Sequence, residues 1–382
     1  MNWGELITLE YGKPVKDKEA TDGKVPVYGT NGQIGTSHLP AQCKHPSFIL
    51  GRKGAYRGVH YSDCPFSVID TAFYAEPLTD RIDLKWAYYK FLTYDINGMD
   101  SGSAIPSTDR YQIYSIEVEV PPLEKQRKIV AVLDCIDRKI NINQKVNDNL
   151  EQQAQAIFKD WFIENPENNE WSTGTFSELI KTTLNGDWGK EAPIGNNAEK
   201  VYCIRGADIP EVKAGNKGKM PTRYILPKNF VTKQLTAGDI VVEISGGSPT
   251  QSTGRCTAIT QSLLDRYDSG MVCTNFCKAI KPKEGYSLFI YYYWQYLYSK
   301  GIFFSYENGT TGIKNLDFSG FIETETILIP PVDKVIAFDD YCKSIFNQIF
   351  ANGKQNEHLA VLRDTLLPKL MSGEIDVSDI QL

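Results

Sequence analysis

The stretch VPPLEKQRKIVAVLDCIDRKININ (residues 120–143) and the stretch IPPVDKVIAFDDYCKSIFNQIFANG (residues 329–353) share one pattern. In each, a Pro-Pro pair is followed at once by apolar residues spaced four and three apart. Proline lacks a backbone N–H and has a fixed φ, so it suits the first turn of a helix and not its interior. The sequence therefore predicts two long helices, each beginning just after a proline pair.

The apolar positions keep a seven-residue period in both segments, which is typical of helices paired along a coiled-coil seam. The two segments match at an offset of 209 residues, and each has two asparagines at mid-seam. The first seam comprises Ile129, Leu133, Ile136, Ile140, Asn143, Asn147, Leu150, Ala154, Ile157 and Trp161. The second comprises Phe338, Cys342, Ile345, Ile349, Asn352, Asn356, Leu359, Arg363, Leu366 and Leu370.

Seam asparagines weaken packing but disfavour slipped registers, where the amide would face only apolar groups. They are also compatible with a wetter, looser section of the pair. The asparagines would face one another in either a parallel or an antiparallel pair, so they do not settle the direction. Two residues weaken the second helix: Gly353 costs about 1 kcal/mol relative to alanine, and Pro368 predicts a kink or a fresh turn.

The regions before the two helices are also duplicated. YGK (11–13) has a counterpart in WGK (188–190), and FILGRKGAYRG (48–58) resembles IVVEISGGSPTQSTGR (240–255). Aromatic helices are expected at 84–94 and 288–298, and final strands in YSIEVEVPP (114–122) and IETETILIPP (322–331). Each globular part thus mixes strands and helices, which is an α+β class with an internal repeat. The expected division is 1–120, 121–164 (first helix), 165–329, 330–373 (second helix) and a tail at 374–382.

Composition places the chain among folded globular proteins, with 41% hydrophobic residues and a net charge of −6. No apolar run approaches the roughly 18–20 residues that span a bilayer. The N-terminal residues have no signal-peptide pattern, and eight irregularly spaced cysteines indicate a reducing compartment, so a cytoplasmic location is expected. Residues 1–120 carry 12 basic and 15 acidic groups, whereas residues 172–329 carry 17 and 15. The acidic first part argues against nucleic-acid binding, and the basic second part favours it.

Catalytic signatures are missing from the sequence. It contains no GxxxxGK[ST], no GxGxxG after a strand, no HExxH and no CxxC, and it has four histidines. Cys43, His45, His60 and Cys64 have the right residue types for zinc, but the spacing C-x-H…H-x3-C matches no familiar site. We therefore expect no catalytic residue, no metal and no cofactor in this chain.

Polar loops have the residue types that read DNA. Lysine and arginine neutralise phosphates, while arginine binds guanine, and asparagine or glutamine binds adenine, in the major groove. The same residue types also fill ordinary surface loops. The candidate DNA-binding residues are Thr30, Asn31, Gln33, Arg52, Lys53, Tyr56, Arg57, Ser103, Arg110, Lys190, Arg205, Ser248, Thr250, Gln251, Arg255, Thr311, Lys314 and Asn315.

Taken together, these segments resemble the specificity subunit of type I restriction–modification systems. The resemblance rests on the first proline-plus-helix element and on five shorter segments. These are AIFKDWF (156–162), LLPKLMSGEI (366–375), VPVYGTNGQIG (25–35), ISGGSPTQSTGR (244–255) and GTTGIKNL (309–316).

This resemblance implies two target-recognition domains held apart by two long helices in an antiparallel coiled coil. Each domain is then expected to read one half of an asymmetric, two-part double-stranded DNA site. The helices would dock two modification subunits, which bring S-adenosylmethionine and methylate adenine, and restriction (motor–nuclease) subunits can join. The specificity subunit itself catalyses nothing. The alternative is a scaffold of the same fold that binds partner subunits without reading DNA.

The expected length of the helices indicates a role for them. Thirty-three residues at 1.5 Å each make a rod of roughly 50 Å. Two domains meet one face of DNA when their half-sites lie about one turn apart, roughly 34–36 Å. The length of the helices is therefore expected to set the unread spacer.

Overall fold

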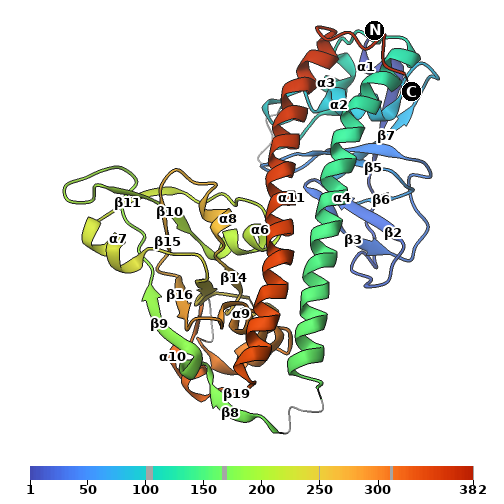
Figure 1. Cartoon of the computed structure of the whole chain (residues 1–382). Helices are drawn as coiled ribbons and strands as arrows, with labels where there is room; N and C mark the ends of the chain where they lie inside the picture. Colours follow the sequence, from blue (N-terminus) through green and yellow to red (C-terminus); the bar gives the residue numbers. More distant parts are fainter. Residues whose placement is uncertain (100–105, 166–169, 249, 310–312, 382) are drawn as a thin grey trace. The chain divides into compact units, whose positions relative to one another are not determined.

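The computed structural model describes residues 1–99, 106–165, 170–248, 250–309 and 313–381 (Figure 1). The chain divides into two compact units: the first comprises Met1–Arg138 with Leu359–Leu382, and the second comprises Lys139–His358. Each unit contains part of both long helices. Among the helices in the described ranges, none combines the length and the apolar composition that a bilayer crossing requires.

Within residues 1–99 and 106–115, the first unit combines seven strands with short helices. Its strands are β1 (Ile7–Tyr11), β2 (Val25–Gly29), β3 (Gly32–Ser37), β4 (Ser47–Gly51), β5 (Val59–Ser62), β6 (Ser67–Val68) and β7 (Ala72–Pro77). Its helices, besides parts of the two long ones, are α1 (Trp3–Leu6), α2 (Leu84–Phe91), the 3-10 turn η1 (Ile96–Gly98) and α3 (Arg110–Ser115).

The second unit repeats this mixture with additional elements. Its strands are β8 (Ser172–Thr175), β9 (Ile180–Asn185), β10 (Glu199–Ile204), β11 (Thr222–Ile225), β12 (Ile240–Glu243), β13 (Ser245–Gly246), β14 (Cys256–Ala258), β15 (Gly270–Cys273), β16 (Cys277–Pro282), β17 (Glu307–Asn308), β18 (Lys314–Leu316) and β19 (Thr326–Ile329). Its helices are α5 (Phe176–Leu179), η3 (Gly206–Asp208), α6 (Ile209–Lys213), α7 (Pro227–Lys233), α8 (Gln261–Leu264), α9 (Ser287–Ser299), η4 (Ile302–Tyr306) and α10 (Phe318–Thr324).

Two sheets in each unit have the same topology. The four-stranded sheet β1-β7-β4-β5 corresponds to β9-β16-β12-β14, and every neighbouring pair is antiparallel. The three-stranded sheet β3-β2-β6 corresponds to β11-β10-β15, in which the middle strand has one antiparallel and one parallel neighbour. The repeat seen in the sequence is therefore a repeat of two whole sheets.

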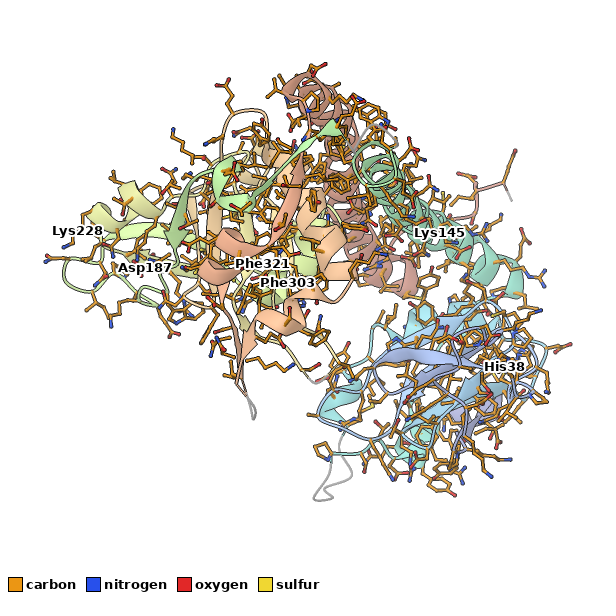
Figure 2. All side chains as sticks on the ribbon, turned by 90° about the horizontal axis from the view of Figure 1, so that it is seen from below. His38, Lys145, Asp187, Lys228, Phe303 and Phe321 are labelled. Atoms are coloured by element: carbon orange, nitrogen blue, oxygen red, sulfur yellow. The ribbon has the colours of Figure 1, made fainter. Side chains whose placement is uncertain are left out.

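Equivalent helices supply the two aromatic cores. In the first unit, the Phe91 ring on α2 lies 4.6 Å from Trp3 and 4.8 Å from Phe48, between ring centroids. In the second unit, Phe321 lies 4.7 Å from Trp294 on α9 and 4.5 Å from Phe303 (Figure 2). All of these side chains are almost fully buried. Because aromatic side chains bury large apolar areas, these clusters are expected to dominate the stability of each unit.

The two long helices are α4 (Leu123–Phe162) and α11 (Val332–Ser372), and they run antiparallel. In the second unit Asn143 donates to Asn356 at 2.8 Å, and Asn352 donates to Asn147 at 2.8 Å. From Asn143 to Asn147 on α4 the residue number rises, while the paired residue on α11 changes from Asn356 to Asn352, so the two helices are antiparallel. In the first unit the Arg363–Asp137 ion pair, at 2.9 Å, follows the same direction.

All the seam positions predicted from the sequence are buried or half-buried. The predicted α+β class, with two mixed domains and a pair of long antiparallel helices, is confirmed by this architecture.

Gly353 and Pro368 affect α11 differently from the sequence expectation. Pro368 lies inside α11, which continues to Ser372, so no fresh helix begins there. A Cβ on Gly353 would lie 1.9 Å from the carbonyl oxygen of Gly215. Gly353 therefore allows the loop after α6 to pack directly on the backbone of α11.

The predicted strand at 114–122 is wrong. Residues 110–115 instead form α3, because the side chain of Asp109 caps it by accepting from the N–H of Tyr111. Beyond α3 only Glu117 makes a bridge, with Asn2. The N-terminal residues pair with this segment: the N–H of Trp3 donates to the carbonyl of Ile116, and the N–H of Val118 donates to the carbonyl of Met1.

Candidate nucleic-acid interface

Three segments of the first unit meet beyond the ends of β1 and β4. Tyr11 ends β1, Arg52 follows β4, and Arg110 begins α3. The guanidinium carbons of Arg52 and Arg110 lie 4.7 and 4.9 Å from the centroid of the Tyr11 ring. The fold thus brings two candidate arginines, 58 residues apart in the chain, onto one aromatic side chain.

Hydrogen bonds orient this cluster while leaving aromatic surface exposed. Arg52 donates to the carbonyl of Asp70 at 2.9 Å, and Arg110 donates to the hydroxyl of Tyr111 at 3.2 Å. The Nε of Arg110 is buried and has no hydrogen-bond partner. Tyr11 is 42% exposed and Tyr111 is 64% exposed. Exposed aromatic rings beside cations are the combination that stacks bases and holds phosphates.

The turn between β2 and β3 packs against the loop after β4. The carbonyl of Thr30 accepts from the N–H of Gly58 at 3.0 Å, and Asn31 is exposed at the tip. Gln33, on β3, donates to the carbonyl of Gly35 at 3.2 Å. In the adjoining loop, Tyr56 is 62% exposed and contributes another aromatic surface.

Lys53 lies in the same loop and belongs to the edge of this surface. Its ammonium lies 4.0 Å from the carboxylate of Asp70, and its backbone bridges to Ser107. The neighbouring candidate Ser103 lies outside the described residues.

Arg57 is buried and does not belong to the surface that the other candidates form. Its side chain is 2% exposed, and its guanidinium donates to the carbonyls of Gly54, Ile96 and Asn97 at 3.2, 3.3 and 2.8 Å. A guanidinium enclosed by backbone carbonyls has no free face for a phosphate. Arg57 instead ties the loop after β4 to η1.

The equivalent edge of the second unit contains a cavity of about 530 Å³. It lies where the segments after β9, β10 and β12 meet, and Arg205 is the candidate residue in its wall. Trp188, Phe276 and Ile313 line it and are 38%, 59% and 65% exposed. The guanidinium carbon of Arg223 lies 3.9 Å from the Trp188 ring centroid, so this edge also pairs a cation with an exposed aromatic ring.

Carboxylates of the second unit neutralise three of its candidate cations. Arg205 makes two hydrogen bonds to Asp208, at 2.9 and 3.1 Å. Arg255 makes two to Glu243, at 2.8 and 2.6 Å. Lys314 lies 2.8 Å from Glu307. Burial opposes ionisation of Glu307, but hydrogen bonds from Lys314 and Thr253 lower its pKa overall. These ion pairs leave little free charge on the three cations.

The remaining candidates of this unit lie in exposed loops. Lys190 is exposed, and its backbone bridges to Tyr224. The hydroxyl of Ser248 accepts from the N–H groups of Thr250 and Gln251, at 3.3 and 3.0 Å, which shapes the turn. Asn315 accepts a hydrogen bond from Ser245 across β13 and β18. Thr311 lies outside the described residues.

Comparison with known proteins shows which proteins this chain resembles. Residues 2–152 match the family model of the type I restriction modification DNA specificity domain. The chain is 26% identical over 331 residues to the type I restriction enzyme MjaIX specificity subunit of Methanocaldococcus jannaschii, an alignment that covers 79% of this chain and 71% of that protein. This chain is similar to the type I restriction–modification specificity subunits.

Two further proteins support this relationship. The type I restriction enzyme HindI specificity subunit of Haemophilus influenzae is 24% identical over 353 residues, which cover 75% of this chain and 74% of that protein. A crystal structure of a type I restriction–modification S subunit from M. genitalium has the same fold, with a TM-score of 0.55 and 17% identity over 97% of this chain and 95% of that one. The family resemblance inferred from the sequence is confirmed.

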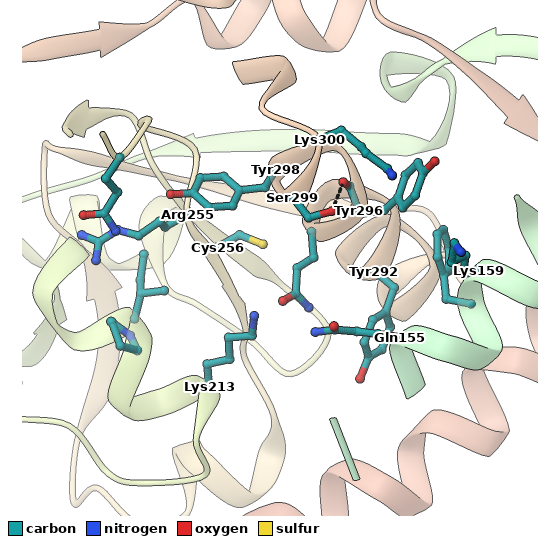
Figure 3. A pocket seen from close by; sticks show the side chains of 15 residues that line it. Gln155, Lys159, Lys213, Arg255, Cys256, Tyr292, Tyr296, Tyr298, Ser299 and Lys300 are labelled. Carbon is teal, nitrogen blue, oxygen red and sulfur yellow. Dashed lines mark hydrogen bonds between the residues drawn. The ribbon is translucent and has the colours of Figure 1, made fainter. Parts of the chain in front are cut away.

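A second cavity, of about 520 Å³, lies between α4, α6 and α9 in the second unit (Figure 3). Lys159, Lys213, Arg255 and Lys300 line it together with three tyrosines, and the candidate Gln251 lies at its edge. Three of the four cations have acidic neighbours: Lys159 lies 2.6 Å from Glu164, Lys213 lies 3.9 Å from Glu151, and Arg255 binds Glu243. The cavity therefore offers weak net attraction for an anion.

Sequence analysis missed the aromatic residues at both edges. Tyr11 is the last residue of β1, Trp188 follows the equivalent strand β9 by three residues, and both rings lie against an arginine. The signal was present in the matching YGK and WGK segments. It was not recognised because the expectation relied on charged and amide side chains for DNA reading, and not on stacking surfaces.

Proposed function

We propose that this chain is the DNA-specificity subunit of a type I restriction–modification complex, and that it reads an asymmetric, two-part site with one unit per half-site. The proposal is carried by the repeated sheet topology, which puts an arginine-stacked aromatic residue at the equivalent edge of each unit. Two copies of one scaffold with different loops are suited to reading two different half-sites. The chain acts by recognition and carries no catalytic residue or cofactor of its own.

The long helices are proposed to dock two modification subunits, which supply S-adenosylmethionine and the methyl transfer to adenine. Restriction subunits join the same complex. On α4, Ile142 and Val146 are 54% and 40% exposed and lie one turn apart on the same helix face. On α11, Val361 and Leu362 are 66% and 47% exposed. Exposed apolar residues on a helix are suited to packing against a partner subunit.

Methylome sequencing tests this function directly. The chain is expressed with its modification subunit in a host that lacks other adenine methyltransferases, and methylated adenines are mapped. We expect one motif with two different specified halves and an unspecified spacer. A continuous motif, or an absence of methylation from a complex that assembles, would contradict the proposal.

Arginine variants then test the site in the first unit. The double variant Arg52→Ala, Arg110→Ala should bind the motif found by methylome sequencing more weakly than the wild type does. The slope of its affinity against salt concentration should decrease by the equivalent of about two phosphate contacts. Lys24→Ala removes an exposed positive charge elsewhere in the same unit and serves as the matched control. Binding is measured by fluorescence anisotropy of labelled duplex at several salt concentrations.

The three neutralised cations of the second unit favour an alternative, a scaffold that binds partners without reading DNA. The two functions differ in one measurement, the affinity of the assembled complex for the methylated motif relative to scrambled duplex. A specificity subunit should prefer its motif by at least about 10³-fold. Equal affinity for both duplexes would favour the scaffold.

A further inference from the structure

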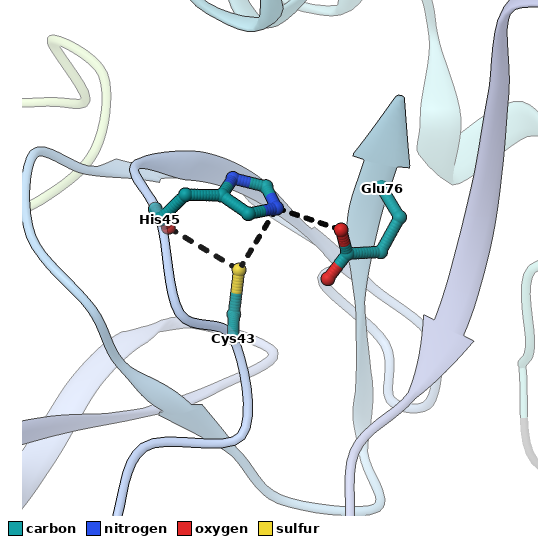
Figure 4. A group of neighbouring side chains, drawn as sticks. All are labelled: Cys43, His45 and Glu76. Carbon is teal, nitrogen blue, oxygen red and sulfur yellow. Dashed lines mark hydrogen bonds and ion pairs between the residues drawn. The ribbon is translucent and has the colours of Figure 1, made fainter. Parts of the chain in front are cut away.

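Three potential metal ligands converge in the first unit, away from the candidate interface (Figure 4). Cys43 and His45 both lie in the segment before β4, and Glu76 lies on β7. The ligand atoms of the three side chains all lie within 4.8 Å of one another. In the described part of the chain, no other set of three histidine, cysteine or acidic residues comes together in this way.

This set differs from the four residues considered in the sequence. His60 turns to the carbonyl of Thr30, at 3.2 Å, and the sulfur of Cys64 lies 3.7 Å from the hydroxyl of Ser62. Glu76, 31 residues beyond His45, takes their place because β7 runs beside β4. Sequence spacing alone does not indicate this carboxylate.

We propose that Cys43, His45 and Glu76 bind one zinc ion, with a water molecule as the fourth ligand. Tetrahedral zinc bonds of about 2.0–2.3 Å place neighbouring ligand atoms about 3.3–3.6 Å apart. The Cys43 sulfur lies 3.9 Å from Nε2 of His45, and Nε2 lies 2.6 Å from Oε2 of Glu76. These two separations fall on either side of the required ones, and the separation between the Cys43 sulfur and the Glu76 carboxylate is at most 4.8 Å, so side-chain movements of about 1 Å complete the site.

The imidazole of His45 already has the orientation of a zinc ligand. Its Nδ1 lies 2.9 Å from the carbonyl of Pro46, and an N–H donated there leaves Nε2 to face the carboxylate and the thiol. Such a hydrogen bond from the remote ring nitrogen is the usual support for a metal-bound histidine. Without metal, a proton must occupy the short contact between Nε2 and Glu76. Burial lowers the pKa of His45, but the hydrogen bond to Glu76 raises it overall.

Cys43 is fixed and protected by its surroundings. Its backbone N–H and carbonyl both bond to Phe66, at 2.9 and 3.1 Å, and its side chain is fully buried. Burial raises the pKa of the thiol to about 11, so zinc must displace a proton from it. The side chains of His45 and Glu76 are 37% and 34% exposed, which gives the ion and its water a route from solvent. Zinc affinity should therefore fall as the pH is lowered, because protons compete for Cys43 and His45.

Cobalt(II) is the spectroscopic probe for this site. The test uses the full chain with Cys64→Ser and Cys135→Ser, which removes the two exposed thiols and keeps the six buried ones. After chelator treatment, one equivalent of cobalt should produce a thiolate charge-transfer band in the near-ultraviolet and the strong visible bands of four-coordinate cobalt. One equivalent of zinc should remove both. Binding only at large cobalt excess, or without these bands, would overturn the proposal.

Ligand variants assign the bands to the three residues. Cys43→Ser should abolish the charge-transfer band, and Glu76→Gln should weaken binding by more than about 100-fold, since loss of even an outer partner costs 10–100-fold. Glu76→Gln can still accept from His45, so it tests the site where Cys43→Ser impairs folding. His38→Gln is the matched control, because His38 (Figure 2) pairs with Asp22 at 3.0 Å on the surface and does not belong to the set of three ligands. A full-strength charge-transfer band in folded Cys43→Ser protein, or unchanged affinity in Glu76→Gln, would exclude the site.

Discussion

At the scale of single residues, two arginines that are five positions apart in the sequence differ in burial. Arg52 lies over the Tyr11 ring at the surface, whereas Arg57 is enclosed by three backbone carbonyls. Both belong to one basic loop with no acidic residue between them. Their positions therefore differ: the first lies at the surface, and the second holds the loop in place.

Replacing Arg57 should accordingly affect stability. Arg57→Ala removes a buried, charge-assisted set of hydrogen bonds and leaves the carbonyls of Ile96 and Asn97 without this donor, so we expect a loss of at least about 2 kcal/mol in the free energy of unfolding. Arg52→Ala should cost less than about 1 kcal/mol, mainly a cation–π contact. Urea unfolding followed by circular dichroism measures both, and equal stability of the two variants would contradict this assignment.

At the scale of elements, the paired asparagines join the two helices and also hold a loop. Asn147 accepts from Asn352 across the seam and donates to the carbonyls of Ala214 and Ile349, both at 3.1 Å. The two amides are 4% and 7% exposed. Instead of a loose, wet section, this part of the seam is a hydrogen-bonded junction between α4, α11 and the loop after α6.

A double-mutant cycle measures that junction. Asn147→Ala leaves the buried side-chain N–H of Asn352 without its acceptor, and Asn352→Ala leaves the buried side-chain oxygen of Asn147 without its donor. Each loss costs about 1–3 kcal/mol. Asn147→Ala should cost more, because its amide also binds Ala214. The double variant should be more stable than the sum of the singles predicts, by about 0.5–3 kcal/mol. Additive losses in urea unfolding would show that the two amides act independently.

For Gly353, in the same junction, helix propensity and the structure predict stability changes of opposite sign. Helix propensity alone predicts that Gly353→Ala stabilises α11 by about 1 kcal/mol. The structure predicts destabilisation, because the new Cβ would lie 1.9 Å from the Gly215 carbonyl oxygen. Gly215 itself has φ +84° and accepts from Arg266 at 2.7 Å, so its carbonyl is held in place. Thermal unfolding measures the sign of the stability change, and Lys354→Ala, on the exposed face of α11, is the control. A Tm of Gly353→Ala above that of the wild type would contradict the prediction.

At the scale of the whole molecule, the proposed function makes the helix pair a spacer between two readers. Seven residues inserted between Asn141 and Ile142, with seven more between Glu357 and His358, keep the seam period in both helices. They lengthen each helix by about 10 Å, or about three base pairs of DNA. Methylome sequencing should then show the same two half-sites with a spacer about three base pairs longer.

Seven residues inserted in α4 alone provide the control, because they put the α4 seam out of step with α11. That variant should lose methylation or stability. An unchanged spacer in the methylated motif of the double insertion would show that the helices do not set the distance.

Much of the architecture was predictable from short-range patterns. The proline pairs and the seven-residue period predicted both long helices, since a helix start and an apolar face depend on neighbours in the chain. Repeated segments likewise predicted two similar α+β parts. The strand expected at 114–122 did not form because the Asp109 cap starts α3, which extends to Ser115 and leaves only the bridge between Glu117 and Asn2 beyond it.

The sequence by itself determined the helix pair, the internal repeat and the residue types available to each loop, because periodicity and turn chemistry act over a few residues. Tertiary structure alone decided the antiparallel direction, the burial of Arg57, the stacking of Arg52 and Arg110 on Tyr11, and the meeting of Glu76 with Cys43 and His45. Each of these depends on segments far apart in the chain coming within hydrogen-bonding or stacking distance. Packing of whole elements sets those distances, and no local pattern encodes them.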